Sequence, residues 1–391
     1  MDKRPETHFN KPRGEHTEIK HNLFSKTVKI SLSIANNMAR NNKYASSYTY
    51  LDLFAGSGKF KDDSKGSPLI AVEISATHLK DKSNVFKEIN LILIEKNQQN
   101  ADKLKQNVIL ELEKYNNPKN LKVKIGSASW EEYDVEKILS SSTWGFVFAD
   151  PFSTELKLDD LKTELENCSK YKDILIFANY NTLARQHARG HDNDIQRVCN
   201  FFGISESELQ GNDFSEKFID LLKNQFKSIK DFSIGVAIPI EVKQELRTMD
   251  YFYLVLFTSS VMVGNAFLES YENEIEQYRG KETSLPFTND GDEPLFDLLK
   301  QRNELSLKEI WEYYIQNFLS WKKIVHDSNL RVPTLKNITD AINDFRKKDL
   351  LKITANEEYI YKKPKDKIGS IKAGSIKNIH DLKAIKIKSS L

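Results

Sequence analysis

The alternation of short apolar segments with longer helical segments constrains the fold of this chain more than any other feature. Five apolar segments of strand length follow one another, at 48–54, 89–95, 120–126, 145–150 and 173–180. Helical segments separate them, and 97–115 is an example. Strands that are apolar on both faces and alternate with helices are typical of a doubly wound parallel sheet. We therefore predict an α/β fold built on such a sheet.

Two further apolar segments, 232–240 and 251–259, close the predicted sheet. About ten residues separate them, which is too few for a helical crossover, so we expect these strands to pair antiparallel. Parallel strands closed by an antiparallel hairpin match a Rossmann-like class I methyltransferase sheet better than a dehydrogenase sheet. An amphipathic helix is expected ahead of the sheet, from Thr17 to about Arg40.

The length of 391 residues predicts more than one domain. After a turn-rich segment, three helical segments and a hairpin at 351–363 follow in the order of a winged helix. The expected organisation is a polar leader at 1–15, a methyltransferase-like domain at 16–277, a linker at 278–294, a winged-helix-like domain at 295–363 and a lysine-rich flexible tail at 364–391.

The composition of the chain indicates in which cellular compartment it works and which partners it is expected to have. Lysine and arginine (58) nearly balance aspartate and glutamate (56), so no polyanion partner is indicated for the whole surface. The only two cysteines, Cys168 and Cys199, argue against a disulfide framework or a cysteine metal site, and we expect them in a core. No apolar run approaches the ~20 residues of a membrane span, and the polar N-terminus lacks a signal-peptide pattern. A soluble cytoplasmic protein is expected.

A turn of small residues follows the first predicted strand, in "YLDLFAGSGKF" at 50–60. It resembles a P-loop, but Leu53 stands where that loop needs its first glycine, and Phe60 replaces the magnesium-binding hydroxyl. A dinucleotide-binding fingerprint is weakened because Lys61 stands at the place of its third glycine. Both nucleotide interpretations therefore lack parts that their chemistry requires.

The same turn meets the requirements of an S-adenosylmethionine (SAM) site. Asp52 ends the strand and can interact with the amino-acid end of SAM, directly or through water. Ala55, Gly56 and Gly58 follow, and a backbone with small or absent side chains lets a cofactor lie over it. A tight strand-to-helix turn without a ligand is the alternative.

The second and third strands also end in candidates for the cofactor site. Glu95 can accept hydrogen bonds from both ribose hydroxyls of SAM, and Lys96 follows it. The distance along the chain from the glycine turn exceeds the ~20 residues usual for this contact, so we expect an inserted loop before the intervening helix. Ser127 and Ala128 are expected beside the adenine. A solvated strand end is the alternative for Glu95.

The fourth strand ends in "ADPFST", where Asp150, Pro151 and Phe152 resemble the [DNS]-P-P-[YFW] motif of amino-directed methyltransferases. In those enzymes the acid side chain and a backbone carbonyl accept hydrogen bonds from the amine, and the aromatic ring stacks on a flipped base. The second proline of the motif is missing here. A strand that simply ends in an Asp-Pro turn is the alternative.

Polar residues after the fifth strand are the expected substrate contacts, namely Asn179, Asn181 and Arg185. His187 and His191 stand four residues apart, which suggests zinc, but no H-E-x-x-H glutamate lies between them. A solvated or basic surface patch is the favoured interpretation of the two histidines. No metal site is expected.

Several segments resemble, in sequence and in order, the three-Cys-motif partner protein family. They are "KH" at 20–21, "YLDLFAGSGKF" at 50–60, "GSPLIAVE" at 66–73, "IEK" at 94–96 and "ADPF" at 149–152. The resemblance covers about residues 15 to 270. It implies a methyltransferase-type fold and a separate partner with a three-cysteine, radical-SAM-like motif, in gene sets of mobile elements or phage defence. "DPFS" stands here where that family usually has "DPFG".

In the C-terminal domain, Thr334 is expected to cap a helix that runs to about Lys348, with Lys336 and Asn337 on its free face. Such a helix can enter the major groove of a nucleic acid. The candidate contacts are Lys336, Arg346, Lys347 and Lys348. A winged helix used for protein docking is the alternative.

Together these features predict a SAM-dependent methyltransferase that acts on an amino nitrogen of a nucleic acid. Two alternatives come from other classes of protein. The chain can be a non-catalytic partner or scaffold with a methyltransferase fold, or a nucleic-acid-binding regulator that works through its winged helix. The glycine pattern and the closing hairpin both disfavour an oxidoreductase.

Overall fold

A computed structural model describes most of the chain up to residue 279 and shorter segments after it. The described residues are 15–40, 47–151, 154–166, 168, 172–209, 214–224, 226, 229, 234–244, 247–279, 307–324, 332–347, 351–353, 360–361, 370–371 and 385–387. The chain divides into two compact units, Met1–Phe267 and Leu268–Leu391. The predicted sheet belongs to the first unit.

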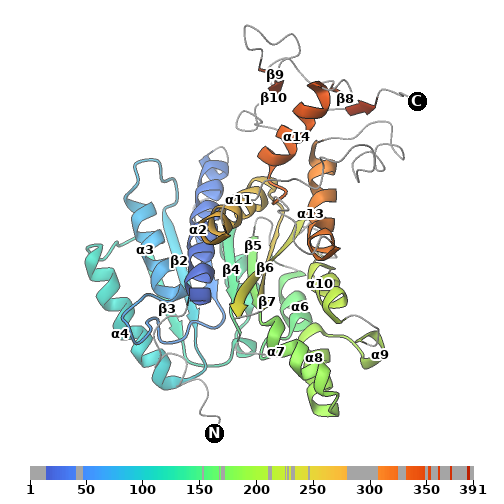
Figure 1. Cartoon of the computed structure of the whole chain (residues 1–391). Coiled ribbons are helices and arrows are strands. Elements are labelled where there is room, and N and C mark those ends of the chain that lie inside the picture. Colours follow the sequence, from blue (N-terminus) through green and yellow to red (C-terminus); the bar gives the residue numbers. More distant parts are fainter. Residues whose placement is uncertain are drawn as a thin grey trace. The chain divides into compact units, whose positions relative to one another are not determined.

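The sheet of the first unit has seven strands (Figure 1). They are β1 (Ser47–Asp52), β2 (Glu88–Ile94), β3 (Leu121–Gly126), β4 (Trp144–Ala149), β5 (Lys172–Ala178), β6 (Ile234–Gln244) and β7 (Arg247–Thr258). Their order is β3-β2-β1-β4-β5-β7-β6. The first five strands run parallel, and β7 pairs antiparallel with β5 and β6. The predicted parallel strands and closing hairpin are confirmed.

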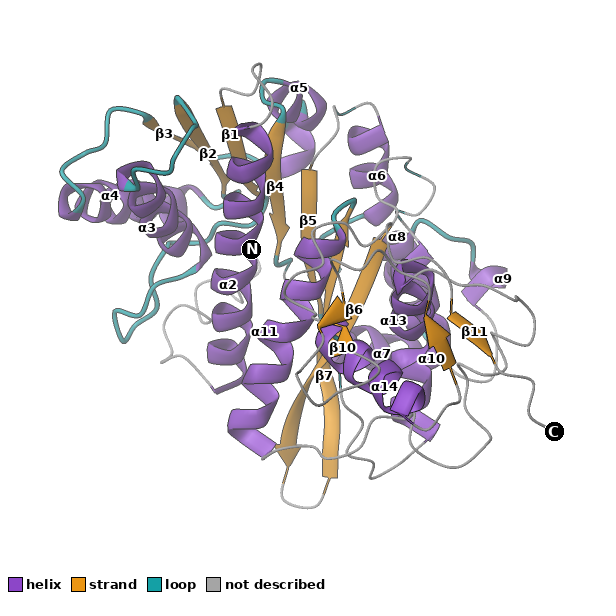
Figure 2. Ribbon diagram, turned by 90° about the horizontal axis from the view of Figure 1, so that it is seen from above, coloured by secondary structure: helices purple, strands orange, loops and turns teal. Residues whose placement is uncertain are grey.

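Helices cover both faces of the sheet, which explains why a central strand such as β4 is apolar throughout. All 6 residues of β4 are buried. Figure 2 shows α2, α3 and α4 on one side of the sheet and α5, α6 and α8 on the other. The helices are α2 (Glu15–Arg40), α3 (Ser67–Lys80), α4 (Gln98–Lys114), α5 (Val135–Ser140), α6 (Leu158–Glu166), α7 (Tyr180–Arg189), α8 (Asp192–Phe202), α9 (Glu206–Leu209), α10 (Phe214–Asn224) and α11 (Val261–Arg279).

The helix α2 confirms the amphipathic segment predicted ahead of the sheet. Its buried face contains Leu23, Phe24, Val28 and Leu32, which recur at helical spacing. The ring centroids of Phe24 and Phe148, in β4, are 4.4 Å apart. Full burial of each such side chain contributes roughly 1.5–3 kcal/mol, so this apolar face fixes α2 across the middle of the sheet.

A buried polar network ties α2 to the amino-terminal end of β5. The Asp173 carboxylate accepts hydrogen bonds from Ser31 Oγ of α2 and Thr258 Oγ1 of β7, both at 2.5 Å. The hydroxyl of Tyr48 lies 3.4 Å from Ser31 Oγ. Burial raises the pKa of Asp173 to about 6, and the two hydroxyl donors oppose that rise.

The described part of the second unit includes α13 (Leu307–Ile324) and α14 (Leu335–Lys347). Thr334 Oγ1 accepts a hydrogen bond from Asn337 N at 3.2 Å, so the predicted helix cap is confirmed. Lys336 is exposed as expected. The expectation that Asn337 lies on the free face is wrong, because its side-chain amide is buried and donates to Val332 O and Glu272 Oε1.

Short strands follow α14 in the second unit, namely β8 (Leu351–Ile353), β9 (Ile360–Tyr361), β10 (Ser370–Ile371) and β11 (Ile385–Ile387). β8 pairs antiparallel with β11, and β9 with β10, so the hairpin predicted at 351–363 does not form between β8 and β9. Ile-Lys-Ile in β11 repeats the apolar alternation of Leu-Lys-Ile in β8, which lets one strand complement the other. The winged helix itself stays a prediction.

Two further expectations concern single features of the chain. Cys168 and Cys199 are both buried and free of disulfide bonds, in keeping with a place in the core. Among the described helices, none combines the length and apolar character needed to cross a membrane.

Replacing Ser31 by Ala removes one of the two hydroxyl donors of Asp173. We expect the variant to lose about 1–3 kcal/mol of unfolding free energy at pH 8, because the ionised, buried carboxylate then keeps only one of its two hydroxyl donors, Thr258 Oγ1. The loss should shrink at pH 5, below the folded-state pKa of about 6, where the carboxyl group holds its proton. Denaturant unfolding at both pH values measures the difference.

Ser33→Ala is the matched control on the same helix. Ser33 Oγ donates to the carbonyl of Lys29 at an exposed site, so its loss should stay within about 0.5 kcal/mol at either pH. Equal losses for Ser31→Ala at pH 5 and pH 8 would contradict the role given to Asp173.

Candidate functional site

Three carboxylates gather at the carboxyl ends of three neighbouring parallel strands. Asp52 is the last residue of β1, and Glu95 and Asp150 directly follow β2 and β4. Asp52 pairs with Leu93 and Phe148, so each flanking carboxylate lies two residues beyond its level (93 to 95, 148 to 150). The strand order also reverses between β1 and β4. Open α/β sheets bind their ligands at this switch point.

The turn after β1 is held against the end of β2. Ala55 N donates to Ile94 O at 2.8 Å, and Gly56 N donates to Glu95 Oε2 at 2.8 Å. Gly56 has a φ of 62°, in the left-handed region that favours glycine. Hydrogen bonds therefore join the turn of small residues to the end of β2 and to the Glu95 carboxylate.

Gly58 meets a packing requirement of its own. Its φ is 83°, and a Cβ at this position would lie 2.9 Å from Leu104 Cδ1 of α4 and 3.4 Å from Leu69 Cγ of α3. Sequence reasoning attributes this glycine to the space that a cofactor needs. The structure shows that the close approach of α3 and α4 requires it as well.

A short loop separates the glycine turn from α3, and this confirms the predicted insertion. Lys59 and Lys65 form an antiparallel bridge across the loop. Gly66 N then donates to Gly58 O at 2.8 Å. The loop thus leaves the turn and returns to it, and α3 starts beside the end of β1.

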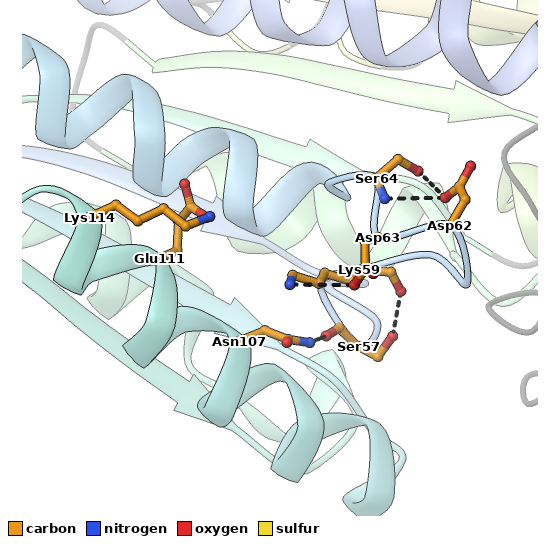
Figure 3. Close-up of polar contacts among 8 residues, drawn as sticks. All are labelled: Ser57, Lys59, Asp62, Asp63, Ser64, Asn107, Glu111 and Lys114. Atoms are coloured by element: carbon orange, nitrogen blue, oxygen red, sulfur yellow. Dashed lines mark hydrogen bonds and ion pairs between the residues drawn. The ribbon is translucent and has the colours of Figure 1, made fainter.

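Side chains of α4 hold both the turn and the loop, and Figure 3 shows Asn107 of α4 beside Ser57 of the turn. Asn107 Nδ2 donates to Ser57 O at 2.8 Å. The side chain of Glu111 is 1% exposed and pairs with Lys65 Nζ and Lys114 Nζ, both at 2.7 Å. Because one of these cations comes from the loop, the buried carboxylate fixes the loop to α4.

Asp52 is fully enclosed, with 0% exposure. Its carboxylate accepts hydrogen bonds from Ser67 Oγ at 2.8 Å and from the Tyr50 hydroxyl and Phe54 N, both at 3.1 Å. Burial raises the pKa of Asp52 to about 7, the three hydrogen bonds oppose the rise, and the charge of Asp150 adds to it. Asp52 therefore changes its charge near neutral pH, and carboxyl groups with shifted pKa values are common at functional sites.

Glu95 is nearly as enclosed, with 9% exposure. Besides Gly56 N, its carboxylate accepts Asn97 N at 2.8 Å, through Oε1. Burial raises the pKa of Glu95, and these backbone donors oppose the rise. A carboxylate offers about four acceptor positions, so further donors can bind. Lys96, also predicted for the cofactor site, pairs with Glu155 at 2.8 Å.

A buried lysine of α2 binds Asp150, and the predicted site did not include it. Lys20 Nζ donates to Asp150 Oδ1 at 3.0 Å and Oδ2 at 3.1 Å. The same nitrogen lies 4.5 Å from the ring centroid of Phe177 and 4.3 Å from that of Phe252. A carboxylate and two aromatic faces surround the ammonium group. The sequence offers one signal for it, the "KH" at 20–21.

The other predicted contacts follow β3 and β5. Ser127 is exposed and Ala128 is partly buried. The side chain of Asn179 caps α7, and Arg185 Nε donates to Asn181 O at 3.1 Å. These local bonds make Asn179 and Arg185 part of the structure of α7 itself.

The remaining predicted residues are buried, belong to the second unit or lie outside the described residues. Pro151 is buried, and Phe152 lies outside the described residues. The nucleic-acid candidate Lys336 is exposed on α14 of the second unit, whereas Lys348 and the side chains of Arg346 and Lys347 lie outside the described part. Among the described residues, no group of three or more metal-ligating side chains is arranged to hold a metal ion.

Neither protein-family models nor curated proteins match the sequence of this chain. The resemblance to three-Cys-motif partner proteins therefore stays a prediction.

Solved structures give low-identity matches to the fold. Protein LPL1258 from Legionella pneumophila is 12% identical, with 66% of this chain and 93% of that chain covered and a TM-score of 0.36. An O-methyltransferase from Bacillus cereus in complex with SAH is 10% identical, with 60% and 80% covered and a TM-score of 0.32. The plantazolicin methyltransferase BpumL in complex with SAH is 9% identical, with 66% and 90% covered and a TM-score of 0.31. Such identities assign no role to any residue here.

Gly58→Ala tests the packing of the glycine turn. We expect it to lower the unfolding free energy by about 2–5 kcal/mol, because left-handed strain of about 1–2 kcal/mol adds to overpacking of about 1–3 kcal/mol against Leu104. Gly190→Ala is the control, since its φ is 65° but no atom lies within 4 Å of the added Cβ. Gly190→Ala should lose only the free energy that corresponds to the left-handed strain. Equal losses of unfolding free energy for the two variants in denaturant unfolding would refute the packing argument.

Proposed function

We propose that this protein is a SAM-dependent methyltransferase that transfers a methyl group to an amino nitrogen. One observation carries the proposal, the gathering of Asp52, Glu95 and Asp150 at the switch point of the sheet. SAM presents an ammonium group, a sulfonium group and two ribose hydroxyls, and each of these is complementary to a carboxylate. When bound, SAM supplies an electrophilic methyl group.

The cofactor half of the site fits SAM through Glu95 and Asp52. Glu95 keeps acceptor capacity beyond its two backbone donors, which is what two ribose hydroxyls need. Asp52 is enclosed, so it would act on the ammonium end through its charge and through Ser67 rather than by direct contact. The turn at Ala55 and Gly56 presents backbone without bulky side chains between the two acids.

The acceptor half of the site is centred on Asp150. Its carboxylate would accept an N–H of the amine and hold the nitrogen in line with the methyl group and sulfur. The proton of the amine can leave after methyl transfer, so no strong general base is needed. Phe177 is 1% exposed and lies beside Lys20, so this side of the site is apolar.

The acceptor is proposed to be an amino group of a nucleic acid. This part is supported by the likeness of Asp150 and Pro151 to the motif of amino-directed methyltransferases, and by exposed Lys336. A partner with a three-cysteine, radical-SAM-like motif is proposed on the resemblance in sequence alone. Methyl-labelled SAM, incubated with the protein and with DNA or RNA, would show by mass analysis which of them takes up the label.

One observation favours a second candidate, a non-catalytic scaffold with the same fold. The three carboxylates already have partners inside the chain, because Asp52 accepts three hydrogen bonds, Glu95 accepts two from the backbone and Asp150 binds Lys20. Internal pairing of this kind stabilises a fold without any ligand. The scaffold and the enzyme differ in whether they bind SAM.

Calorimetric titration with SAM between pH 6 and pH 8 separates the two candidates. If a cation binds near Asp52, the affinity of the wild-type protein should rise about tenfold over this range as the group with a pKa of about 7 loses its proton. Binding at pH 7 should release protons, which titrations in two buffers of different ionisation enthalpy detect. Asp52→Asn should bind at least about tenfold more weakly at pH 8 and lose this pH dependence.

Asp102→Asn is the control, because Asp102 lies exposed on α4 and pairs with Lys105 at 3.0 Å. Its affinity for SAM should equal that of the wild-type protein at every pH. Absence of wild-type binding at millimolar SAM would end the methyltransferase proposal and leave the scaffold.

A further inference from the structure

We propose that Lys20 is itself a methyl acceptor, so that the protein methylates the Nζ atom of its own Lys20. This inference rests on the proposed methyltransferase function. Asp150 is the group proposed to receive the acceptor amine, and in the structure it already holds a primary amine, at 3.0 Å and 3.1 Å from its two oxygens. Lys20 Nζ therefore occupies a position that Asp150 offers to an acceptor amine.

The sheet register puts this amine at the edge that carries the cofactor residues. Asp150 and Phe177 directly follow Ala149 and Ile176, which are partners in the pairing of β4 with β5. Phe252 precedes the β7 residue that pairs with the end of β5. The group that surrounds Lys20 Nζ therefore stands on the carboxyl side of the sheet, next to Asp52 across the switch point.

The surroundings of Lys20 suit both the amine and its methylated product. A methylated ammonium keeps its positive charge, so it keeps its attraction to the faces of Phe177 and Phe252. Monomethyl and dimethyl forms also keep at least one N–H for Asp150, whereas a trimethyl form keeps none. We therefore expect one or two methyl groups on Lys20 and not three.

Because Lys20 is buried, its Nζ atom can be methylated only by a reaction within the same molecule. The side chain of Lys20 is 7% exposed, so a second protein cannot bring an active site to its Nζ atom while the fold is intact. A methyl donor bound at the carboxyl ends of β1 and β2 needs no such access. Lys29 lies exposed on the same helix and provides the internal comparison.

The reaction balances with the groups in place. Lys20 Nζ passes one proton to the Asp150 carboxylate and becomes a neutral amine. Its lone pair forms the N–C bond to the methyl group of SAM, while the C–S bond breaks and its electron pair stays on sulfur as the thioether of S-adenosylhomocysteine (SAH). Asp150 then releases the proton to water, so each turnover consumes one SAM and yields one proton.

Mass spectrometry of the purified protein tests the proposal directly. The wild-type protein is incubated with SAM that carries a deuterated methyl group, digested, and sequenced by tandem mass analysis. One or two labelled methyl groups are expected on Lys20 and none on Lys29. Lys20→Arg should abolish the label, whereas Lys29→Arg should not change it.

A second measurement needs no turnover. SAM carries one positive charge more than SAH, and an ammonium group beside the methyl position disfavours that charge. Lys20→Gln should therefore shift the ratio of the dissociation constants of SAM and SAH at least about threefold in favour of SAM, while Lys29→Gln should leave the ratio unchanged. Thermal melting of each variant establishes that it is folded, and the wild-type mass result stands without any variant.

The outcomes separate this inference from the function on which it rests. SAM binding without label on Lys20 would overturn the inference and leave the methyltransferase proposal standing. An unchanged ratio in folded Lys20→Gln would place Lys20 away from the methyl group and overturn it too, with Lys20 then a structural partner of Asp150. Absence of SAM binding would overturn both.

Discussion

The parallel pairing of β1 with both β2 and β4 is the constraint on which the candidate site depends. It brings the ends of three strands to one edge, and the register sets Asp52 between Glu95 and Asp150. A slip of one residue would turn every side chain of a strand to the opposite face. The buried aromatic residues of the sheet oppose such a slip, because Tyr50 and Phe146 are stacked with their ring centroids 6.2 Å apart. Packing in the core thus determines the positions of the three carboxylates at the edge of the sheet.

Like charges placed this close repel, and the chain stabilises each of the three carboxylates by different means. Glu95 accepts two backbone amides, Asp150 binds the ammonium of Lys20, and Asp52 accepts two hydroxyls and one backbone amide. Asp52 is fully buried, and this burial is the main cause of its raised pKa of about 7, because its neutral donors compensate the ionised form only in part. A binding cation would supply the missing compensation. The electrostatics of the edge therefore favour a positively charged ligand beside Asp52.

The parts of this structure that depend on local pattern could be predicted from the sequence. Apolar runs between helical segments located the parallel strands, and the glycine turn located the end of β1, because strand burial and turn conformation are decided within a few residues. Contacts between distant segments could not be read in this way. Lys20 and Asp150 are 130 positions apart, and the pairing of β8 with β11 joins Ile353 to Ile385, which are also distant along the chain. The enclosure of Asp52 likewise depends on Ser67, which the inserted loop brings back to the strand end.

The ion pair between Lys20 and Asp150 also restricts how an external acceptor can bind. The side chain of Asp150 is 32% exposed, so displacing Lys20 would leave a partly buried carboxylate without a charged partner, which is unfavourable. An incoming alkylammonium could replace the charge of Lys20, but an exocyclic amine of a nucleobase is neutral and could not. A nucleobase would therefore have to share Asp150 with Lys20, using acceptor positions that the ammonium leaves open. In that arrangement Lys20 remains part of the acceptor site, held between Phe177 and Phe252 while Asp150 serves both nitrogens.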